Sequence, residues 1–436
     1  MSDVSHVPRR SRTWLVVILV VTVLVLGLVA AGLVISRWWP SSEPTEGSTQ
    51  FVDLYRTDLP THTTPKDLLV LVFNYDSDGY TDPDEEIEQS WSDYIFGTGS
   101  YEQGTASIND YFKEISQGLF SFAPVLLDDN TTGVYSFHLD KEYSDEQGLH
   151  QEWPFFEYLY DVMHALDSLS DRGLDISRFA ASGVDNTNYG QVMIDYFAST
   201  QKDRPAQWYA TSSILCVFPP YNTEKMDFTP LSSSLDAFTF YAHINYNTPF
   251  GVIAHELGHL LGAIDVYNFG AYPSDLMSTA SKSMPDPYNV SHIDPFYKLI
   301  FGWQEPIVIQ DSGNVTLYPA TSEHYQPAII VKDDPNQYYI IENRRSEKFD
   351  TGLAENAAEG INIWRIDKLG CEAIYELSRK GISLEGVLSA PGDEIEVLKY
   401  TSTDNIKDVT EEPANIEISY LTTNPDNSIT ATIRFI

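Results

Sequence analysis

The chain has 436 residues, of which 42% are hydrophobic and 13% aromatic. This length and composition are enough for a large core or for two to three domains, and they exclude a disordered chain. The formal net charge is −37 at pH 7. A surface this acidic repels nucleic acid and anionic lipid, so we expect no nucleic-acid partner. It either keeps the protein soluble or attracts cations.

The N-terminal region has the pattern of a membrane anchor. Residues 1–12 contain three arginines, and the following segment Trp14–Ile35 is 22 residues long without a charge. As a helix this segment would extend roughly 33 Å, which is enough to cross a bilayer. We therefore expect a cytoplasmic tail over residues 1–12, a transmembrane signal anchor over 13–36 and an extracellular catalytic domain. Cleavage of the apolar segment as a signal peptide is the alternative.

The next elements are a linker and a buried strand. Residues 37–66 are rich in Pro, Ser, Thr and Glu, which is typical of an extracellular tether, and a short pro-segment is the alternative. Residues 67–73 begin with Asp67 and continue as an uninterrupted apolar run, which predicts a buried strand. The acidic turn 74–79 makes Ca²⁺ possible but unsupported, because an ordinary polar turn has the same composition.

Two helices are expected before the centre of the chain. Residues 105–120 read as a capped helix, a glycine stop and a strand. Residues 152–169 form an aromatic amphipathic helix, on which His164 is interpreted as a packed or surface residue because it has no partner at helical spacing. Residues 191–197 and 213–218 are expected strands. The only cysteines, Cys216 and Cys371, either form one long-range disulfide or remain free.

The strongest pattern in the chain is H-E-x-x-H, formed by His255, Glu256 and His259. Residues four apart lie one above the other on a helix, so both imidazoles can bind one ion. Gly262 can end the helix and let Asp265 approach the same ion as a third ligand. These ligands suit one catalytic Zn²⁺, with Glu256 as the general base for a metal-activated water. The alternative is a buried helix whose histidines bind backbone carbonyls.

The start of this helix is also marked in the sequence. Asn247 or Thr248 can act as the N-cap, and Pro249 fits the first helical position. Apolar side chains are expected to pack the helix into the core: Val252, Ile253, Leu257, Leu260 and Leu261.

The zinc pattern and the segment Ser274-Asp275-Leu276-Met277-Ser278 together resemble the metzincins, in which a methionine turn lies beneath the metal. More narrowly, the chain resembles the immune inhibitor A family of secreted bacterial metallopeptidases. The resemblance implies an α+β fold class: a zincin-like catalytic domain with a twisted mixed sheet, a backing helix at 152–169 and the zinc helix. A β-rich C-terminal region would follow. It also implies that Met277 shapes the floor of the site by packing.

Several segments depart from the family pattern or remain open. Residues 184–193 lack the alternate acidic residues of a calcium loop, and Arg365 stands where members often have histidine. Ala263-Ile264 replaces the usual Leu-Pro before the third ligand. Glu342, Arg344 and Asp367 either contact substrate or brace the β-rich region, and bracing is the interpretation we adopt.

The sequence thus predicts a zinc metallopeptidase domain over residues 67–303 and a β-rich region over 304–436. The expected function is a membrane-anchored extracellular zinc endopeptidase acting on protein or peptide substrates. Two alternatives remain: a cell-surface binding or regulatory module with little catalysis, and a zinc amidase acting on cell-wall peptides. Oligomeric state, substrate preference and latency are not indicated by the sequence.

Overall fold

The computed structural model describes a series of segments separated by gaps. All of them belong to one compact unit, Phe51–Ile436. The described residues are 59–75, 84–139, 154–175, 179, 213–218, 242–266, 275–278, 290–332, 334–356, 359–368, 381–401 and 410–436. The predicted strand at 191–197, the loop at 184–193 and Cys371 lie outside them.

The first sheet is built around one long apolar strand. Its order is β2-β1-β4-β5, and β3 pairs with β1 further along the edge that β2 occupies. Every pairing described in this sheet is parallel. The strands are β1 Lys66–Tyr75, β2 Phe122–Pro124, β3 Val134–Leu139, β4 Ile214–Phe218 and β5 Ala242–Asn245.

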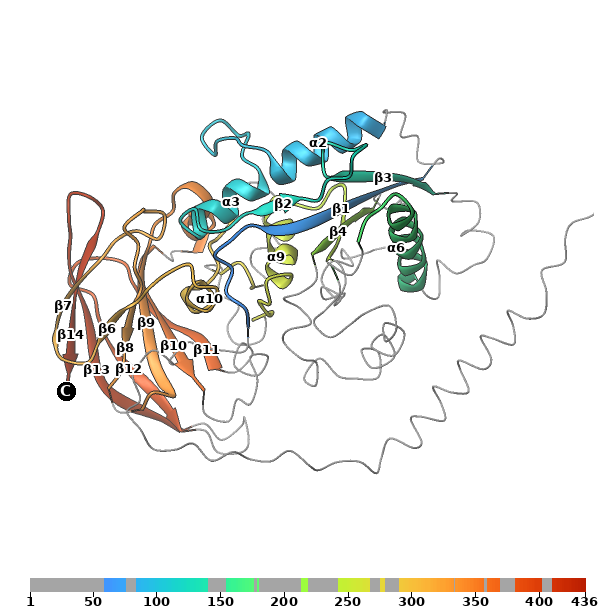
Figure 1. Ribbon diagram of the computed structural model, residues 1–436. Helices are drawn as coiled ribbons and strands as arrows, with labels where there is room; N and C mark the ends of the chain where they lie inside the picture. The colour runs from blue at the N-terminus through green and yellow to red at the C-terminus, as the bar shows by residue number, and fades with distance from the viewer. Residues whose placement is uncertain are drawn as a thin grey trace, which may run out of the picture. The chain divides into compact units, whose positions relative to one another are not determined.

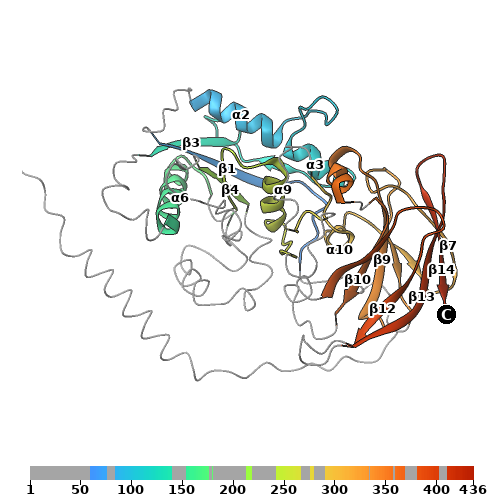
Figure 2. The same cartoon turned by 180° about the vertical axis from the view of Figure 1, so that it is seen from behind.

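Helices cover both faces of this sheet, and the side-chain alternation of β1 determines which face meets which helix. Leu68 and Val70 share a core with α2, α3 and α9, whereas Leu69 and Leu71 share a separate core with α6. Figures 1 and 2 show α2 and α6 on opposite sides of the strands. The helices are α2 Asp84–Phe96, α3 Ile108–Ile115, α6 Pro154–Asp171 and α9 Phe250–His259.

The C-terminal half contains two further sheets that pack face to face. One has the order β11-β10-β9-β8-β6 and the other β12-β13-β14-β7. The strands are β6 Ile307–Ile309, β7 Gly313–Leu317, β8 Ala328–Ile330, β9 Gln337–Arg344, β10 Gly360–Asp367, β11 Ile382–Leu388, β12 Glu394–Thr401, β13 Thr410–Thr423 and β14 Ile429–Phe435. Before β6 comes α10 Pro295–Ile300, and η8 Lys348–Asn356 connects β9 to β10.

Strand β9 belongs to two cores at once. Tyr339 and Ile341 face the second C-terminal sheet, while Tyr338 and Ile340 belong to the core that contains α9. This alternation is the normal pattern of a strand buried on both faces. The β-rich region therefore packs against the helices that carry the candidate site. The core that contains α9 includes residues on both sides of the predicted domain boundary between residues 303 and 304. The boundary itself remains a prediction.

The predicted α+β class with a mixed sheet is wrong. The structure is mixed α/β with several sheets and few helices, and the pairings described in its first sheet are all parallel. The physical reason lies in the connections: parallel neighbours need long crossovers, and β1 is joined to β2 through α2 and α3. A zincin-like architecture is not confirmed by these elements.

The predicted transmembrane anchor and single-pass membrane location are likewise not supported. Within the part of the chain that the structure describes, none of the helices combines the length and apolar character needed to cross a bilayer. The segment 13–36, on which the prediction depended, lies outside the described residues. Neither the anchor nor the membrane location enters the function proposed below.

Several local predictions agree with the structure. The strand expected at 67–73 is β1, the helix expected at 152–169 is α6, and the capped helix near 105 is α3. Ser107 and Asp110 form a capping box at the start of α3. Helix α2 and strand β5 were not predicted.

Candidate metal centre

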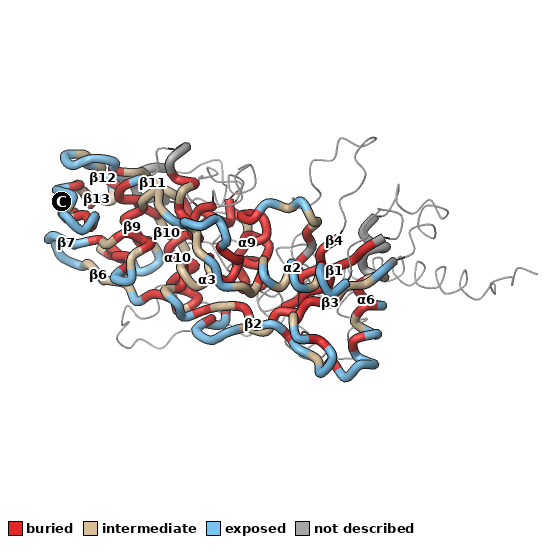
Figure 3. The backbone as a smooth tube through the Cα atoms, turned by 90° about the horizontal axis from the view of Figure 1, so that it is seen from above, coloured by how far each residue is buried: buried red, intermediate tan, exposed pale blue. Residues whose placement is uncertain are grey.

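The candidate site is built on α9, a helix whose ten residues are all buried. Figure 3 shows it as a continuous buried stretch between α2 and α3. The helix begins at Phe250, one residue later than predicted. Its N-cap is Pro249, whose side chain makes no capping hydrogen bond. Thr248 instead accepts a hydrogen bond from the backbone N–H of Asn245 at 2.9 Å, which closes the turn that leads into the helix.

The helix ends as the glycine predicts. Gly262 has φ of 98°, in the region that favours glycine, and the Ala263 N–H donates to the Gly258 carbonyl at 3.1 Å. The chain then reverses, and the Ile264 N–H donates to the Tyr297 hydroxyl at 2.9 Å. This contact with α10 fixes the segment that carries Asp265.

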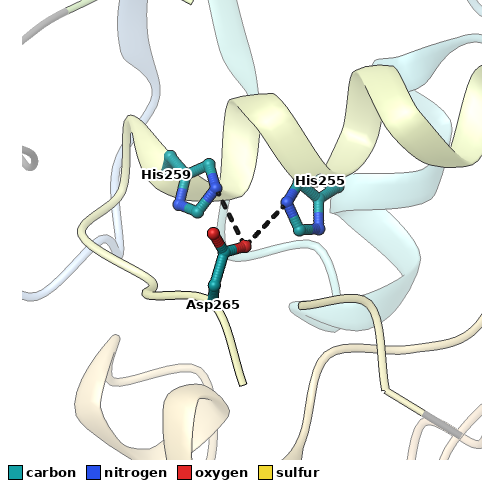
Figure 4. Close-up of side chains that lie close together, drawn as sticks. All are labelled: His255, His259 and Asp265. Atoms are coloured by element: carbon teal, nitrogen blue, oxygen red, sulfur yellow. Dashed lines mark ion pairs between the residues drawn. The ribbon is translucent and has the colours of Figure 1, made fainter. Parts of the chain in front are cut away.

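Three side chains converge on one point (Figure 4). The Asp265 Oδ1 lies 3.1 Å from His255 Nε2 and 3.4 Å from His259 Nε2. One ligand atom from each residue lies within 4.8 Å of the others, which is close enough for all three to bind a single ion. Both histidines are buried, and the Asp265 side chain is 19% exposed.

Backbone carbonyls orient both imidazoles. His255 Nδ1 lies 2.9 Å from the Leu276 carbonyl, and His259 Nδ1 lies 2.8 Å from the Ala263 carbonyl. A carbonyl only accepts, so each Nδ1 carries a proton, and it is Nε2 of each ring that faces the shared point, where the neutral form of the ring would present a lone pair. The alternative in which the histidines merely satisfy carbonyls explains the Nδ1 contacts, but it leaves the convergence of both Nε2 atoms on Asp265 unexplained.

In the metal-free protein the site carries strongly shifted pKa values. Burial lowers the pKa of His259, but attraction to Asp265 and to Glu256 outweighs it and raises the pKa to about 9. Burial alone would raise the pKa of Asp265, yet His259 and His255 hold it well below its usual range. A proton on His259 therefore partly replaces a cation at this point.

Glu256 lies next to the ligands without being one of them. It is 2% exposed, and its charge is close enough to contribute to the raised pKa of His259. The three ligand residues form the cluster without Glu256. Glu256 is thus a buried carboxylate next to the three candidate ligands.

Met277 lies against α9, the helix that carries both histidines. It occupies a turn in which the Ser278 N–H donates to the Asp275 carbonyl at 3.2 Å, and its own carbonyl accepts from the Val266 N–H at 3.1 Å. A Cβ on Gly258 would lie 2.9 Å from Met277 Sδ, so the absence of a side chain at Gly258 lets this turn pack directly on α9. Met277, the residue expected to shape the floor of the site, therefore lies next to both Gly258 and Val266.

Two residues at the start of the described chain, His62 ahead of β1 and Lys66 at its first position, support the end of α9 and were not singled out from the sequence. His62 Nε2 lies 2.8 Å from the Leu261 carbonyl, and Lys66 Nζ donates to the Leu260 carbonyl at 2.6 Å. Both contacts satisfy carbonyls that the helix end leaves without a partner. The sequence predicts a tether or a pro-segment over residues 37–66. No local pattern in that segment indicates these long-range contacts.

Other residues singled out from the sequence lie away from the three ligands. Glu342 and Arg344 are fully buried on β9, which fits bracing, and Asp367 is largely buried on β10. Arg365 forms an ion pair with Glu385 at 3.0 Å, and His164 is exposed on α6. Cys216 is a free, buried thiol.

Comparison with known proteins does not assign the chain to a family. No protein-family model matches it, and no curated protein matches it significantly.

The donor set fits Zn²⁺. Two neutral imidazole nitrogens and one carboxylate oxygen are the ligand types of catalytic zinc sites, which keep a fourth position open. In both imidazoles the Nδ1 hydrogen bond to a backbone carbonyl fixes the ring orientation, as is usual for histidines that bind zinc.

Proposed function

We propose that this protein is a zinc-dependent endopeptidase whose ion is held by His255, His259 and Asp265. The observation that carries the proposal is the convergence of both Nε2 atoms on Asp265 Oδ1, at 3.1 and 3.4 Å. The sequence resemblance to the immune inhibitor A peptidases supports the same proposal. Protein or peptide chains are the proposed substrates.

A bound Zn²⁺ supplies a Lewis acid that polarises a carbonyl and lowers the pKa of water. The chain supplies the proton transfer and the rigidity. Glu256, buried beside the ligands, takes a proton from the attacking water and returns it to the leaving amine. The carbonyls of Leu276 and Ala263 keep the two imidazoles in the tautomer that binds metal.

The matched pair Glu256→Gln and Glu323→Gln tests this function. Glu323 has an 87% exposed side chain and lies in the β-rich region, so its replacement controls for the loss of one negative charge. The assay follows cleavage of an unfolded protein by the full chain with Zn²⁺, and zinc content is measured on the same samples. We expect Glu256→Gln to lower kcat by roughly 10² to 10⁴ with zinc retained, and Glu323→Gln to leave it unchanged.

The remaining outcomes separate the alternatives. Cleavage that persists in Glu256→Gln, or after a chelator has removed the zinc, contradicts the proposal. Zinc bound at one ion per chain without cleavage of unfolded protein favours a binding module, unless the enzyme cleaves cell-wall peptides in a parallel assay, which would assign it as an amidase.

A further inference from the structure

A second concave site lies at the N-terminal end of α9, away from the three ligands. It is a cavity of about 660 Å³ between α2, the loop before α3 and the turn that leads from β5 into α9. This volume lies within the range of pockets that bind small ligands or single side chains. The lining residues that matter for the inference are Glu86, Trp91, Asp93 and Tyr94 on α2 and Tyr246 on the turn before α9.

Three aromatic rings form part of the wall. The ring centroid of Trp91 lies 5.8 Å from that of Tyr94 and 5.9 Å from that of Tyr246. Trp91 and Tyr94 meet edge to face at 82°, while Trp91 and Tyr246 are tilted by 47°. All three residues are half-buried, and their rings line the cavity at different angles.

The aromatic wall is held by the fold. The Tyr246 hydroxyl donates to the Phe73 carbonyl at 3.0 Å, at the end of β1, and also contacts the Asn74 side chain. The Tyr94 ring packs edge to face on Phe250, the first residue of α9, with centroids 6.1 Å apart. A guest in this cavity would meet rings that are already positioned, so little conformational entropy would be lost on binding.

The lining of the cavity carries negative charge. Glu86 and Asp93 are exposed residues of α2, and among the described residues none that lines the cavity is a lysine, arginine or histidine. Asp93 accepts a hydrogen bond from Gln89 at 2.8 Å, which leaves its negative charge in place because the amide is neutral. Aromatic faces attract cations through their quadrupole, and the two carboxylates add a Coulombic attraction of the same sign.

We propose that this cavity binds the cationic side chain of a peptide, an arginine or a lysine. The guanidinium or ammonium group would lie among the rings of Trp91, Tyr94 and Tyr246, and Glu86 and Asp93 would offset its charge. Binding here does not depend on the metal or on Glu256. If the proposed peptidase activity is correct, the cavity holds a basic residue of the substrate beyond the bond that is cleaved.

The first test compares arginine with citrulline, its neutral isostere. Calorimetry measures binding of acetyl-Gly-Gly-Arg-Gly-Gly-amide and of its citrulline counterpart to the full chain, in low salt with a chelator present. The chelator removes catalysis, so failure of the peptidase proposal cannot alter the result. We expect the arginine peptide to bind about tenfold more tightly. Equal affinities, or no binding of the arginine peptide, would overturn the proposal.

The second test assigns the binding to this cavity. The double variant Glu86→Gln/Asp93→Asn removes both charges while nearly preserving side-chain size, and Glu85→Gln is the control because Glu85 is exposed on the same turn outside the lining. The double variant should bind the arginine peptide about fivefold more weakly and the citrulline peptide as before. The control should match the wild type. Unchanged arginine binding in the double variant would place the interaction elsewhere and contradict the proposal.

A third variant addresses the aromatic wall. Trp91→Leu keeps an apolar side chain on α2 but removes the aromatic face, and a thermal unfolding curve shows whether the variant is folded. The folded variant should lose at least half of the preference for arginine over citrulline. A folded Trp91→Leu variant that keeps the full preference contradicts the aromatic part of the proposal.

Discussion

His255, His259 and Asp265 bring two imidazoles and a carboxylate to one point, whereas the carboxylates of Glu342 and Asp350 are each held by the guanidinium of Arg344. In the second group, Arg344 donates to Asp350 through Nε at 2.6 Å and to Glu342 through Nη1 at 3.0 Å. Both histidines and all three members of the second group are buried, while Asp265 is partly exposed. The first presents lone pairs that a metal can bind, and the second already contains the cation that its carboxylates need.

The buried ion network of Glu342, Arg344 and Asp350 is further completed by neutral donors and by Lys298. Glu342 accepts from the Tyr325 hydroxyl at 2.6 Å and from the Trp364 indole at 3.1 Å. Burial alone would raise the pKa of Glu342, but Arg344 and Lys298 lower it overall. Buried charges with this many partners stabilise one arrangement of the chain rather than bind a ligand.

The two groups are connected through the backbone. Asp350 accepts from the His292 N–H at 2.9 Å, and the His292 carbonyl accepts from the Leu276 N–H at 3.1 Å. The Leu276 carbonyl in turn accepts from His255 Nδ1. The ion network on β9 therefore supports the turn that orients one of the metal ligands. The comparison indicates that burial of charge alone does not identify a metal site; the partners of the charges do.

Removing one of the three candidate ligands should have the largest effect of the predicted changes, and the quantity affected is the zinc affinity. If the affinity did not fall, the distinction between the two groups would not hold. We expect Asp265→Ala to weaken zinc binding by roughly a thousandfold, about 4 kcal/mol, because one of three ligands is lost. Competition with a chromogenic chelator measures the affinity. Asp311→Ala, at an exposed position, is the control and should bind zinc as the wild type does. Wild-type affinity in Asp265→Ala would show that Asp265 is not a ligand.

Breaking the ion network should lower stability rather than remove a ligand. Arg344→Met leaves Glu342 and Asp350 buried without their guanidinium, which should lower the free energy of unfolding by about 3–5 kcal/mol. Arg434→Met is the matched control, because Arg434 binds Glu417 at 2.9 Å with a 64% exposed side chain. Its loss should amount to less than about 1 kcal/mol. Urea unfolding measures the free energy of unfolding of both variants. Equal losses in the two variants would contradict the stabilising role of the ion network.

A smaller effect should appear in the pH dependence of stability. Burial raises the pKa of Glu114 to about 7, although Lys348 opposes this shift. The folded state therefore holds this proton more tightly than the unfolded state. The contribution of Glu114 is favourable below about pH 4.5 and is lost as the pH rises to about 7.

Glu114→Gln should remove that contribution. The stability of the variant should fall less than that of the wild type between pH 4.5 and 7, by a difference of up to about 2 kcal/mol. Urea unfolding at several pH values measures it, with Glu323→Gln as the exposed control. A variant that follows the wild-type pH profile would show that Glu114 does not titrate in this range.

Much of the candidate site could be predicted from local sequence patterns. The spacing of His255 and His259 follows from the period of a helix, and Gly262 is required by a backbone conformation that other residues rarely adopt. The approach of Asp265 followed from these two features. By contrast, the predicted N-cap was wrong by one residue, because the hydroxyl of Thr248 closes the preceding turn instead.

The fold was less accessible from local patterns. Strand β1 was predicted from its apolar run, but the direction of its neighbours depends on connections that no window of the sequence contains. The same run was a usable signal, since strands buried on both faces in parallel sheets are continuously apolar. Helix α2 was missed because its exposed face is acidic and few of its residues are buried.

The sequence by itself determined the elements whose cause is local: the helix α9 with its two histidines, its glycine stop, the capped helix α3 and the apolar strand β1. Only the tertiary structure decided what depends on distant residues meeting. Examples are the parallel pairing of β1 with β4, the Leu276 carbonyl that orients His255, and the aromatic cavity at the start of α9. The physical reason is range: helix periodicity and caps act within a few residues, whereas strand direction and the cavity wall depend on segments that are far apart in the sequence.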